Sequence, residues 1–308
     1  MNDFLARLPK AELHVHLEGS VEPETLVELE PSLTRDWIEE VYTYGDFPAF
    51  MRAYEWVNRF LRTPDDYALI TRRLLRRLES ENVRYAEINL SAGVILWKKQ
   101  DLAAIDAAVR RAAAESPVVV RWIWDAVRQW SAEEALRVAE MAAERLDEGV
   151  AGFGLGGDEM RGPAEKFASV FAFARSKGLH LAPHAGEITG PEAVWAALEL
   201  GAERIGHGIA AARDPRLLDT LRERDIPLEI SITSNVLLGA VPSLREHPVR
   251  RIFDAGVPIT LNTDDPGLFR TTLTREYEIA ARAFGFTESE LKQIAANAFR
   301  YAFFQYTV

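Results

Sequence analysis

Two histidines near the start of the chain, His14 and His16, have the spacing of a metal-binding pair. They lie in the alternating run Glu-Leu-His-Val-His-Leu at residues 12–17, and side chains two residues apart on a β-strand point to the same side. Imidazole is a preferred zinc ligand, and a strand holds two rings toward one point at little entropic cost. Taken alone, the pair fits a metal site and a pair of core or surface histidines equally well.

Short β-rich runs that alternate with helical stretches are the elements that would position such a site. After the opening strand, the runs fall at residues 83–91, 118–127, 150–157, 179–185, 204–208, 227–234 and 258–263. Helical stretches lie between them at 101–115, 131–148, 162–177, 191–200, 215–224 and 249–255, and two more helices follow at 274–284 and 288–303. Eight strands with intervening helices predict an α/β fold, a (β/α)8 TIM barrel, as a single domain spanning residues 1–308.

A long helical region at residues 22–80 separates the first two predicted strands, so the barrel carries extra helices there as well as at its C-terminus. This region holds aromatic residues at roughly helical spacing: Tyr42, Tyr44, Phe47, Phe50, Tyr54, Trp56 and Phe60. Such a stripe is typical of a helix-packing surface. On a segment that follows a barrel strand, the same aromatics could instead fold over the carboxyl end of that strand as part of a lid.

The composition argues against several classes of protein. A net charge of −11 and a pI near 5.2 disfavour nucleic-acid and anionic-membrane partners, both of which need a basic face. The absence of cysteine excludes disulfides, thiolate zinc sites and cysteine nucleophiles. With neither a signal-peptide nor a membrane-span pattern, we expect a cytoplasmic protein with a small-molecule partner. Whether it is a monomer or a homo-oligomer is left open.

Polar residues gather at the predicted carboxyl ends of the strands, where barrel enzymes carry their chemistry. They occupy residues 156–159, 184–187, 207–208, 234–235 and 262–265. This places further candidate ligands beside the histidine pair. The four candidates for one zinc ion are His14, His16, His184 and Asp264. His180 and His247 have no motif around them, and we interpret both as structural.

Such a zinc site would support hydrolysis. Zinc lowers the pKa of a bound water to about 7, which provides hydroxide at neutral pH. Glu187, three residues beyond a candidate ligand, is placed to shuttle the protons that attack on an electron-poor carbon requires. Burial must then raise its pKa for part of the cycle. His207 is the candidate that orients the hydroxide, and Asp265 is the candidate that accepts a hydrogen bond from the substrate.

The lysines bear on the number of metal ions. Many barrel hydrolases with two metals bridge them through a modified lysine on a strand. None of the lysines in this chain lies on a predicted strand: they are Lys10, Lys98, Lys99, Lys166, Lys177 and Lys292. We therefore expect one zinc ion per chain.

The motifs together resemble those of the adenosine deaminase family of the amidohydrolase superfamily, across nearly the whole chain. They fall at residues 12–20, 157–159, 184–187, 204–208, 234–235 and 261–266. The resemblance implies hydrolytic deamination of a 6-aminopurine, in which hydroxide adds to C6 and ammonia leaves. It further implies that Glu187 handles the proton at N1 and that His207 steadies the hydroxide. Asp265 would engage N7, and the backbone of Gly157 would contact N3.

One departure from the family pattern bears on the substrate. Members that act on adenosine typically carry Asp at the position of Glu18, where it contacts the ribose 5′-hydroxyl. The longer side chain leaves three substrates open: adenosine, free adenine, and a nucleoside with an altered 5′ end such as 6-amino-6-deoxyfutalosine. Residues 61–73 and 85–94 look most like the aminodeoxyfutalosine deaminase branch. Its carboxylate substrate would need a cation near the lid, for which Arg52, Arg59 and Arg62 are candidates.

Two other classes of function compete with deamination. A barrel hydrolase that cleaves a non-purine amide, ester or phosphoester bond would release no ammonia from purines, and a second metal would favour it. A non-catalytic ligand-binding barrel could keep the fold, but the complete set of candidate acid, base and ligands argues against that interpretation.

Overall fold

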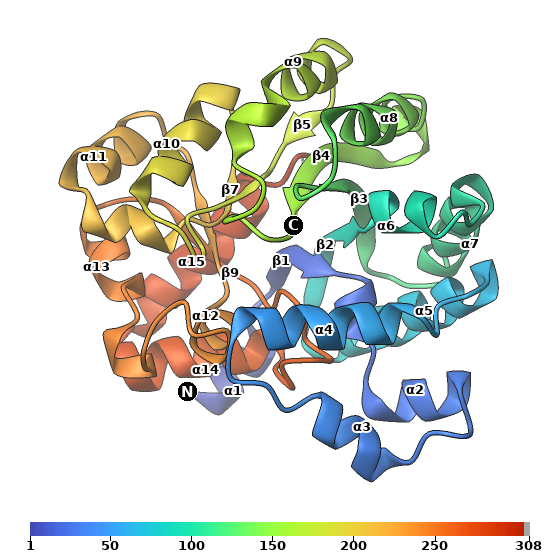
Figure 1. Cartoon of the computed structure of the whole chain (residues 1–308). Helices are drawn as coiled ribbons and strands as arrows, with labels where there is room; N and C mark the ends of the chain where they lie inside the picture. Colours follow the sequence, from blue (N-terminus) through green and yellow to red (C-terminus); the bar gives the residue numbers. More distant parts are fainter. Residues whose placement is uncertain (305–308) are drawn as a thin grey trace.

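The computed structural model describes residues 1–304, which form nine parallel strands surrounded by helices (Figure 1). One sheet has the order β1 (Lys10–His16), β2 (Val83–Leu90), β3 (Val119–Val127), β4 (Val150–Gly156) and β5 (His180–Leu181). The other has the order β6 (His184–Ala185), β7 (Ile205–His207), β8 (Leu228–Ile230) and β9 (Ile259–Leu261). Every neighbouring pair is parallel, so all the carboxyl ends lie at one rim.

Backbone hydrogen bonds join the two sheets at both edges and close the barrel. At one edge, His16 N donates to Asp264 O at 2.7 Å and Asp264 N donates to His14 O at 3.0 Å. At the other edge, Gly206 N donates to Pro183 O at 3.0 Å. The prediction of a (β/α)8 barrel is confirmed. The predicted strand 179–185 is however divided into β5 and β6, because Pro183 between them has no N–H to donate to a neighbouring strand.

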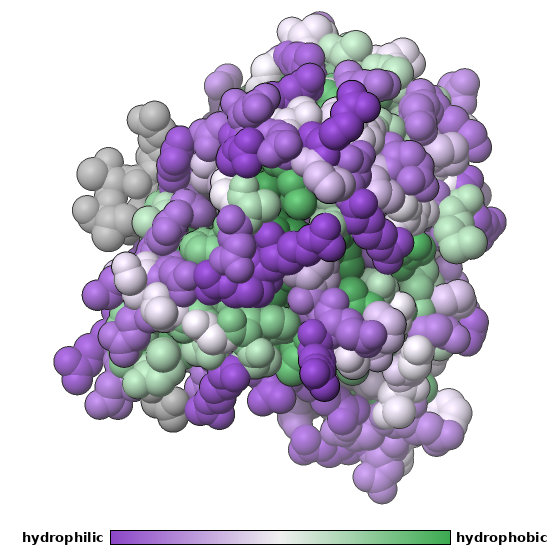
Figure 2. All heavy atoms as spheres, turned by 90° about the vertical axis from the view of Figure 1, so that its left-hand side faces the viewer, coloured by the Kyte–Doolittle hydropathy of each residue, from purple (hydrophilic) through white to green (hydrophobic). Residues whose placement is uncertain are grey.

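Helices α6 (Ala92–Trp97), α7 (Leu102–Ala113), α8 (Ala132–Ala143), α9 (Ala168–Ser176), α10 (Pro191–Leu200), α11 (Pro215–Glu223) and α13 (Val249–Asp254) follow successive strands around the barrel. Short 3-10 turns accompany them. In α11, Leu217 and Leu221 are buried against the barrel while Arg216 and Arg222 stay outside. Figure 2 shows the resulting face, on which hydrophilic side chains cover most of the surface. Within residues 1–304 no helix is long and apolar enough to cross a membrane.

One predicted strand ends earlier than expected. The run 227–234 is a strand only over β8, and α12 (Ile232–Leu237) begins two residues later. Ser234 and Asn235 therefore lie on a helical turn above the strand end, and both are fully buried. At the C-terminus, α14 (Leu273–Phe284) and α15 (Glu288–Arg300) appear as predicted. Asn297 of α15 donates to the carbonyl of Ile259 on β9, which ties this helix to the barrel.

The region between β1 and β2 forms four helices: α2 (Pro23–Leu29), α3 (Arg35–Val41), α4 (Phe47–Asn58) and α5 (Pro64–Ser80). Asp46 caps α4 by accepting a hydrogen bond from Ala49 N at 2.7 Å. Thr63 and Asp66 form a capping box at the start of α5. The two caps define where α4 and α5 begin. In Figure 1, α4 lies across the front of the barrel.

Lys10 corrects one expectation, because it is the first residue of β1 and so does lie on a barrel strand. Its amine donates to the carbonyls of Leu5, Leu8 and Glu81. These contacts lie at the amino end of the strand, opposite the rim that carries His16. Lys10 is therefore too far from the candidate site to bridge metal ions there.

Candidate active site

Four buried side chains converge at the carboxyl rim of the barrel. His14 and His16 come from β1, His184 from β6, and Asp264 from the residues after β9. The Nε2 atoms of His16 and His184 are 3.1 Å apart. Asp264 Oδ1 lies 3.3 Å from His16 Nε2 and 3.4 Å from His14 Nε2. The ligand atoms of His14, His184 and Asp264, together with one of His207, lie within 4.8 Å of one another. His16 joins this group through its short distances to His184 and Asp264.

The spacing of these atoms fits a single bound metal ion. Two ligand atoms about 2.1 Å from the same tetrahedral ion lie about 3.4 Å apart. His14 Nε2 is buried and has no hydrogen-bond partner among the described residues, and leaving a buried polar atom unpaired is costly. Burial disfavours a charged ring at His16, but the carboxylates of Asp264, Asp265 and Asp125 together outweigh it and raise the pKa of His16 to about 9. This set of imidazole and carboxylate donors therefore fits a bound metal ion.

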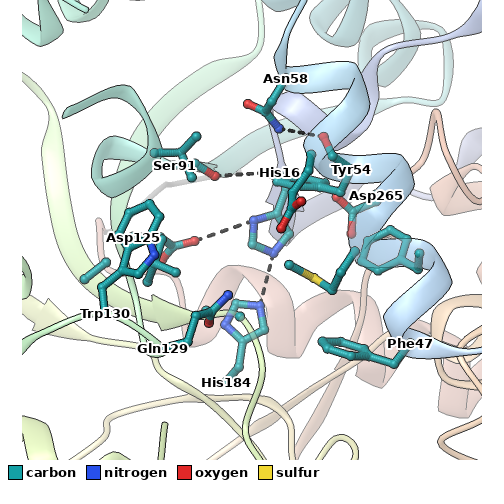
Figure 3. A pocket seen from close by; sticks show the side chains of 18 of the residues that line it. His16, Phe47, Tyr54, Asn58, Ser91, Asp125, Gln129, Trp130, His184 and Asp265 are labelled. Atoms are coloured by element: carbon teal, nitrogen blue, oxygen red, sulfur yellow. Dashed lines mark hydrogen bonds and ion pairs between the residues drawn. The ribbon is translucent and has the colours of Figure 1, made fainter. Parts of the chain in front are cut away.

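Three further polar groups orient the cluster. Glu229 Oε2 accepts from His14 Nδ1 at 2.8 Å, so that Nε2 of the same ring keeps its lone pair. Asp125 Oδ2 lies 3.5 Å from His16 Nδ1, and Figure 3 shows His16 between this carboxylate and His184. Ser234 Oγ donates to Asp264 Oδ2 at 2.7 Å. Neither Asp125 nor Glu229 was predicted from the sequence, although a carboxylate within an apolar strand is a signal for such a role.

A buried arginine supports Glu229 in turn. Arg204 donates through Nε to Glu229 Oε1 at 2.6 Å, and it also forms an ion pair with Glu87. All three side chains are at most 2% exposed. A buried arginine between two carboxylates compensates charges that would otherwise be expensive to bury. The motif at residues 204–208 therefore contributes to the site through its first residue as well as through His207.

Glu187 sits in the loop after β6 and faces His207, with 3.6 Å between Glu187 Oε1 and His207 Nε2. Burial, together with the charges of Asp264 and Glu159, raises the pKa of Glu187 well above its usual range. Glu159 also fixes the loop itself. Its carboxylate accepts from the backbone N–H groups of residues 186–189 at 2.7 to 3.2 Å.

His207 is held by two side chains behind it. Its Nδ1 lies 3.1 Å from the amide nitrogen of Asn235, whose oxygen lies 3.1 Å from His247 Nε2. His247, which we interpreted as structural, is thus linked to the site through Asn235. His180 instead pairs with Glu203 at 2.8 Å in a half-exposed position away from the cluster.

Asp265 and Gly157 both line the cavity that opens onto the cluster, as do His207 and Glu187. Gly19 packs against Asp265 so closely that a Cβ atom there would lie 1.7 Å from Asp265 Oδ1. Burial and the neighbouring Asp264 raise the pKa of Asp265 well above its usual range.

Glu18 is fully buried and is not part of the cavity wall. Its Oε1 accepts from Ser91 N at 3.1 Å, and its Oε2 lies 3.5 Å from the hydroxyl of Tyr54. The Tyr54 and Ser91 hydroxyls are 2.8 Å apart and both line the cavity. Contact between Glu18 and a substrate would therefore have to pass these two groups.

The cavity has a volume of about 400 Å³ and lies between the cluster and α4. Phe47, Phe50 and Tyr54 of α4 line it, as the interpretation of these aromatics as a lid predicts. Tyr42 and Tyr44 do not line it. Tyr42 is buried in the core, and the ring of Tyr44 lies edge-on to Phe269, which follows β9. At a further part of the wall, Trp97 and Trp130 stack with their rings 5.9 Å apart.

A closed parallel barrel with histidine and aspartate donors clustered at its carboxyl rim is the arrangement found in metal-dependent hydrolases of the amidohydrolase class. Residues 9–307 match the family model described as adenosine deaminase. The chain belongs to the adenosine deaminase family, whose members are hydrolytic deaminases that act on C–N bonds.

Individual relatives agree with this assignment. An aminodeoxyfutalosine deaminase of Streptomyces coelicolor is 41% identical, covering 98% of this chain and 82% of the relative. An adenine deaminase of Rhizobium leguminosarum bv. trifolii is 36% identical, covering 96% and 95%. The crystal structure of an amidohydrolase from Burkholderia ambifaria with bound zinc superimposes with a TM-score of 0.91 at 29% identity, covering 98% of this chain and 88% of that one.

Proposed function

We propose that the protein is a zinc-dependent deaminase that releases ammonia from carbon 6 of a 6-aminopurine nucleoside. The observation that carries the proposal is the cluster of histidine and aspartate side chains with Glu187 beside it at the floor of one cavity. The residues that would hold one zinc ion are His14, His16, His184 and Asp264. A bound zinc ion supplies a water molecule acidic enough to lose a proton near neutral pH. Metal analysis that found two tightly held ions per chain would contradict the single site.

The remaining residues would bind the purine and move protons. Glu187, with its raised pKa, delivers a proton to N1 and later to the leaving ammonia. His207 makes a hydrogen bond to the attacking oxygen. Asp265 contacts N7, and the backbone N–H of Gly157 donates to N3. In support, all four residues line the same cavity.

The substrate we favour carries an altered 5′ end with an anionic group, as 6-amino-6-deoxyfutalosine does. Of the three arginines considered from the sequence, Arg59 alone lines the cavity. Arg62 is paired with Glu30 at 2.7 Å. Within residues 1–304, the Arg59 side chain has no ion pair or hydrogen bond, although Glu55 lies one turn earlier on α4. Arg59 is therefore available to an anionic group.

Two other residues of the cavity wall bear on the nature of the 5′ group. Lys98 also lines the cavity, but its amine is engaged by the carbonyls of Asn58 and Leu61 at the end of α4. Trp97 is 66% exposed while stacked on Trp130. Exposed indole faces beside a cavity suit a flat group. The 5′ substituent would then be flat and carry a carboxylate. The similarity to an aminodeoxyfutalosine deaminase supports the same choice.

A series of substrates separates these contributions. We would compare kcat/KM for adenosine, 5′-S-benzyl-5′-thioadenosine, its 3-carboxybenzyl analogue and 6-amino-6-deoxyfutalosine. We expect Trp97→Ala to lower kcat/KM for the benzyl and carboxybenzyl nucleosides by about tenfold. Arg59→Gln should lower kcat/KM by about tenfold only for the two substrates that carry a carboxylate, the 3-carboxybenzyl analogue and 6-amino-6-deoxyfutalosine. Arg52→Gln is the matched control, because Arg52 is exposed on α4 but does not line the cavity. Equal effects of Arg59→Gln and Arg52→Gln would rule out this binding mode.

Adenine is the second candidate substrate, and Glu18 is the observation that favours it. The carboxylate of Glu18 accepts hydrogen bonds from Ser91 N and the Tyr54 hydroxyl and is not part of the cavity wall, so it does not present an oxygen to a ribose hydroxyl in the cavity. An adenine deaminase is also among the relatives. A kcat/KM for adenine at least tenfold above that for every nucleoside would establish this alternative. Hydrolysis of an amide, ester or phosphoester without ammonia release would instead indicate the different class of hydrolase.

A further inference from the structure

We infer that His247 fixes the tautomer of His207, and that it does so through the side-chain amide of Asn235. His247 lies two residues before α13, outside the cavity, and is 4% exposed. His247 is therefore a positioning residue. Its importance for turnover rests on the proposed function, in which His207 meets the reacting atoms. The tautomer of His207 does not depend on the proposed function.

The chain of hydrogen bonds is anchored by a donor whose direction is fixed. The backbone N–H of Val249 donates to His247 Nδ1 at 3.2 Å. Val249 is the first residue of α13, and the N–H groups of a first helical turn have no acceptor within the helix. Because Nδ1 accepts this bond, the hydrogen of the neutral His247 ring must lie on Nε2. Burial lowers the pKa of His247 to about 3, which keeps the ring neutral.

The position of this hydrogen fixes the direction of the next two hydrogen bonds, from His247 to Asn235 and from Asn235 to His207. His247 Nε2 donates across 3.1 Å, so the Asn235 atom that faces it must be the amide oxygen. The Asn235 nitrogen consequently faces His207 Nδ1, at 3.1 Å. An amide nitrogen can only donate. His207 Nδ1 is therefore the acceptor, and the hydrogen of its neutral ring lies on Nε2.

This tautomer determines what His207 can do at the cluster. Its Nε2 lies 3.6 Å from Glu187 Oε1 and 3.9 Å from Asp264 Oδ2. A ring nitrogen that carries hydrogen has no lone pair for a metal, so His207 is a donor beside the cluster and not a fifth ligand. His14 shows the opposite arrangement. Its Nδ1 donates to Glu229, which leaves Nε2 free as a ligand.

The test is a nitrogen-15 NMR spectrum of the zinc-loaded enzyme with labelled histidine, which contains six histidines. We expect His207 Nε2 to show a protonated-type signal and Nδ1 an unprotonated-type signal. Asn235→Asp offers only acceptors to both rings, so we expect Nδ1 of His207 to become protonated. His247→Leu should leave the His207 ring as a mixture of both tautomers. His247→Gln can still donate to Asn235 and should restore the wild-type signals. His180→Gln is the matched control and identifies one unrelated ring.

Turnover gives a second readout with the proposed substrates. Asn235→Asp and His247→Leu should lower kcat at least about tenfold with zinc content and KM unchanged, and His247→Gln should recover most of it. A wild-type spectrum with Nδ1 of His207 protonated would overturn the inference. So would His207 signals that are identical in the wild type, Asn235→Asp and His247→Leu. Because the spectra need no substrate, an enzyme inactive on every purine would refute the proposed function and leave this inference standing.

Discussion

Glu159, just beyond β4, holds the backbone of Glu187, whose N–H donates to Glu159 Oε2 at 3.0 Å. The same carboxylate accepts from three neighbouring N–H groups in that loop. A side chain that is 4% exposed thus determines where the proposed proton carrier sits. It does so from a different β-α unit of the barrel.

We expect Glu159→Gln to disturb the loop at residues 186–189, because the NH₂ group of the new glutamine would face backbone N–H groups that also donate. The predicted result is a fall in kcat of about 10- to 100-fold with little change in KM. The free energy of unfolding should also fall by about 2 kcal/mol. Steady-state kinetics and chemical denaturation measure the two effects. Glu165→Gln is the exposed control from the same connection, and comparable kinetics for both variants would contradict the assigned role.

The carboxylate behind His14 can be tested by metal affinity. Glu229→Gln removes the charged acceptor that directs the lone pair of His14 Nε2 into the cluster. We predict a loss of zinc affinity of about 10- to 100-fold, measured by competition with a chelator. Glu203→Gln breaks a carboxylate–histidine pair of the same 2.8 Å length at His180, and it should leave the affinity unchanged. Equal affinities in both variants would show that Glu229 does not support the metal site.

Gly19 provides a steric test of Asp265. A methyl group at residue 19 would overlap the Asp265 carboxylate, so Gly19→Ala must displace that side chain. We predict a decrease in kcat/KM of at least about tenfold with bound zinc retained. At Gly45 no atom lies within 4 Å of an added Cβ, and Gly45→Ala should behave as wild type. Full activity in Gly19→Ala would mean that the position of Asp265 is unimportant.

The buried ion network predicts a stability difference between two arginines. Arg204→Leu would leave Glu87 and Glu229 buried without their cation, and we expect the free energy of unfolding to fall by about 3–5 kcal/mol. Arg222→Leu removes an exposed pair with Asp219 and should cost at most about 1 kcal/mol. Denaturant titration compares the two variants directly. A similar cost for both would show that the network contributes nothing beyond a surface ion pair.

The parts of the site that the sequence predicts are those governed by strand geometry. Side chains two apart on β1 share a face, and parallel strands end at one rim, so His14 and His16 could be placed with His184 and Asp264 before any coordinates. Strand limits were less predictable. The boundary between β5 and β6 depends on the missing N–H of Pro183, and the early end of β8 depends on where α12 begins.

The supporting residues could not be predicted, because their roles come from contacts between distant parts of the chain. Glu229 lies 215 residues from His14, and no motif near Glu229 indicates that it contacts this histidine. His247 is linked to His207 through Asn235, which lies on a helix whose first three residues were predicted to be the end of a strand. Glu159 stood in a recognised motif, yet its acceptor role depends on a loop 27 to 30 residues later. Local patterns do not encode such pairings.

In the function we propose, the metal cluster and Glu187 together deaminate a 6-aminopurine. The most direct measurement is ammonia release by the zinc-loaded enzyme from adenine, adenosine, 5′-methylthioadenosine and 6-amino-6-deoxyfutalosine, with the metal content determined in parallel. We predict one ammonia for each 6-oxopurine formed, loss of activity on chelation, and a fall of about 10²- to 10⁴-fold in Glu187→Gln with zinc still bound. Metal-loaded enzyme that releases no ammonia from any of these purines, or unchanged turnover in Glu187→Gln, would contradict the claim.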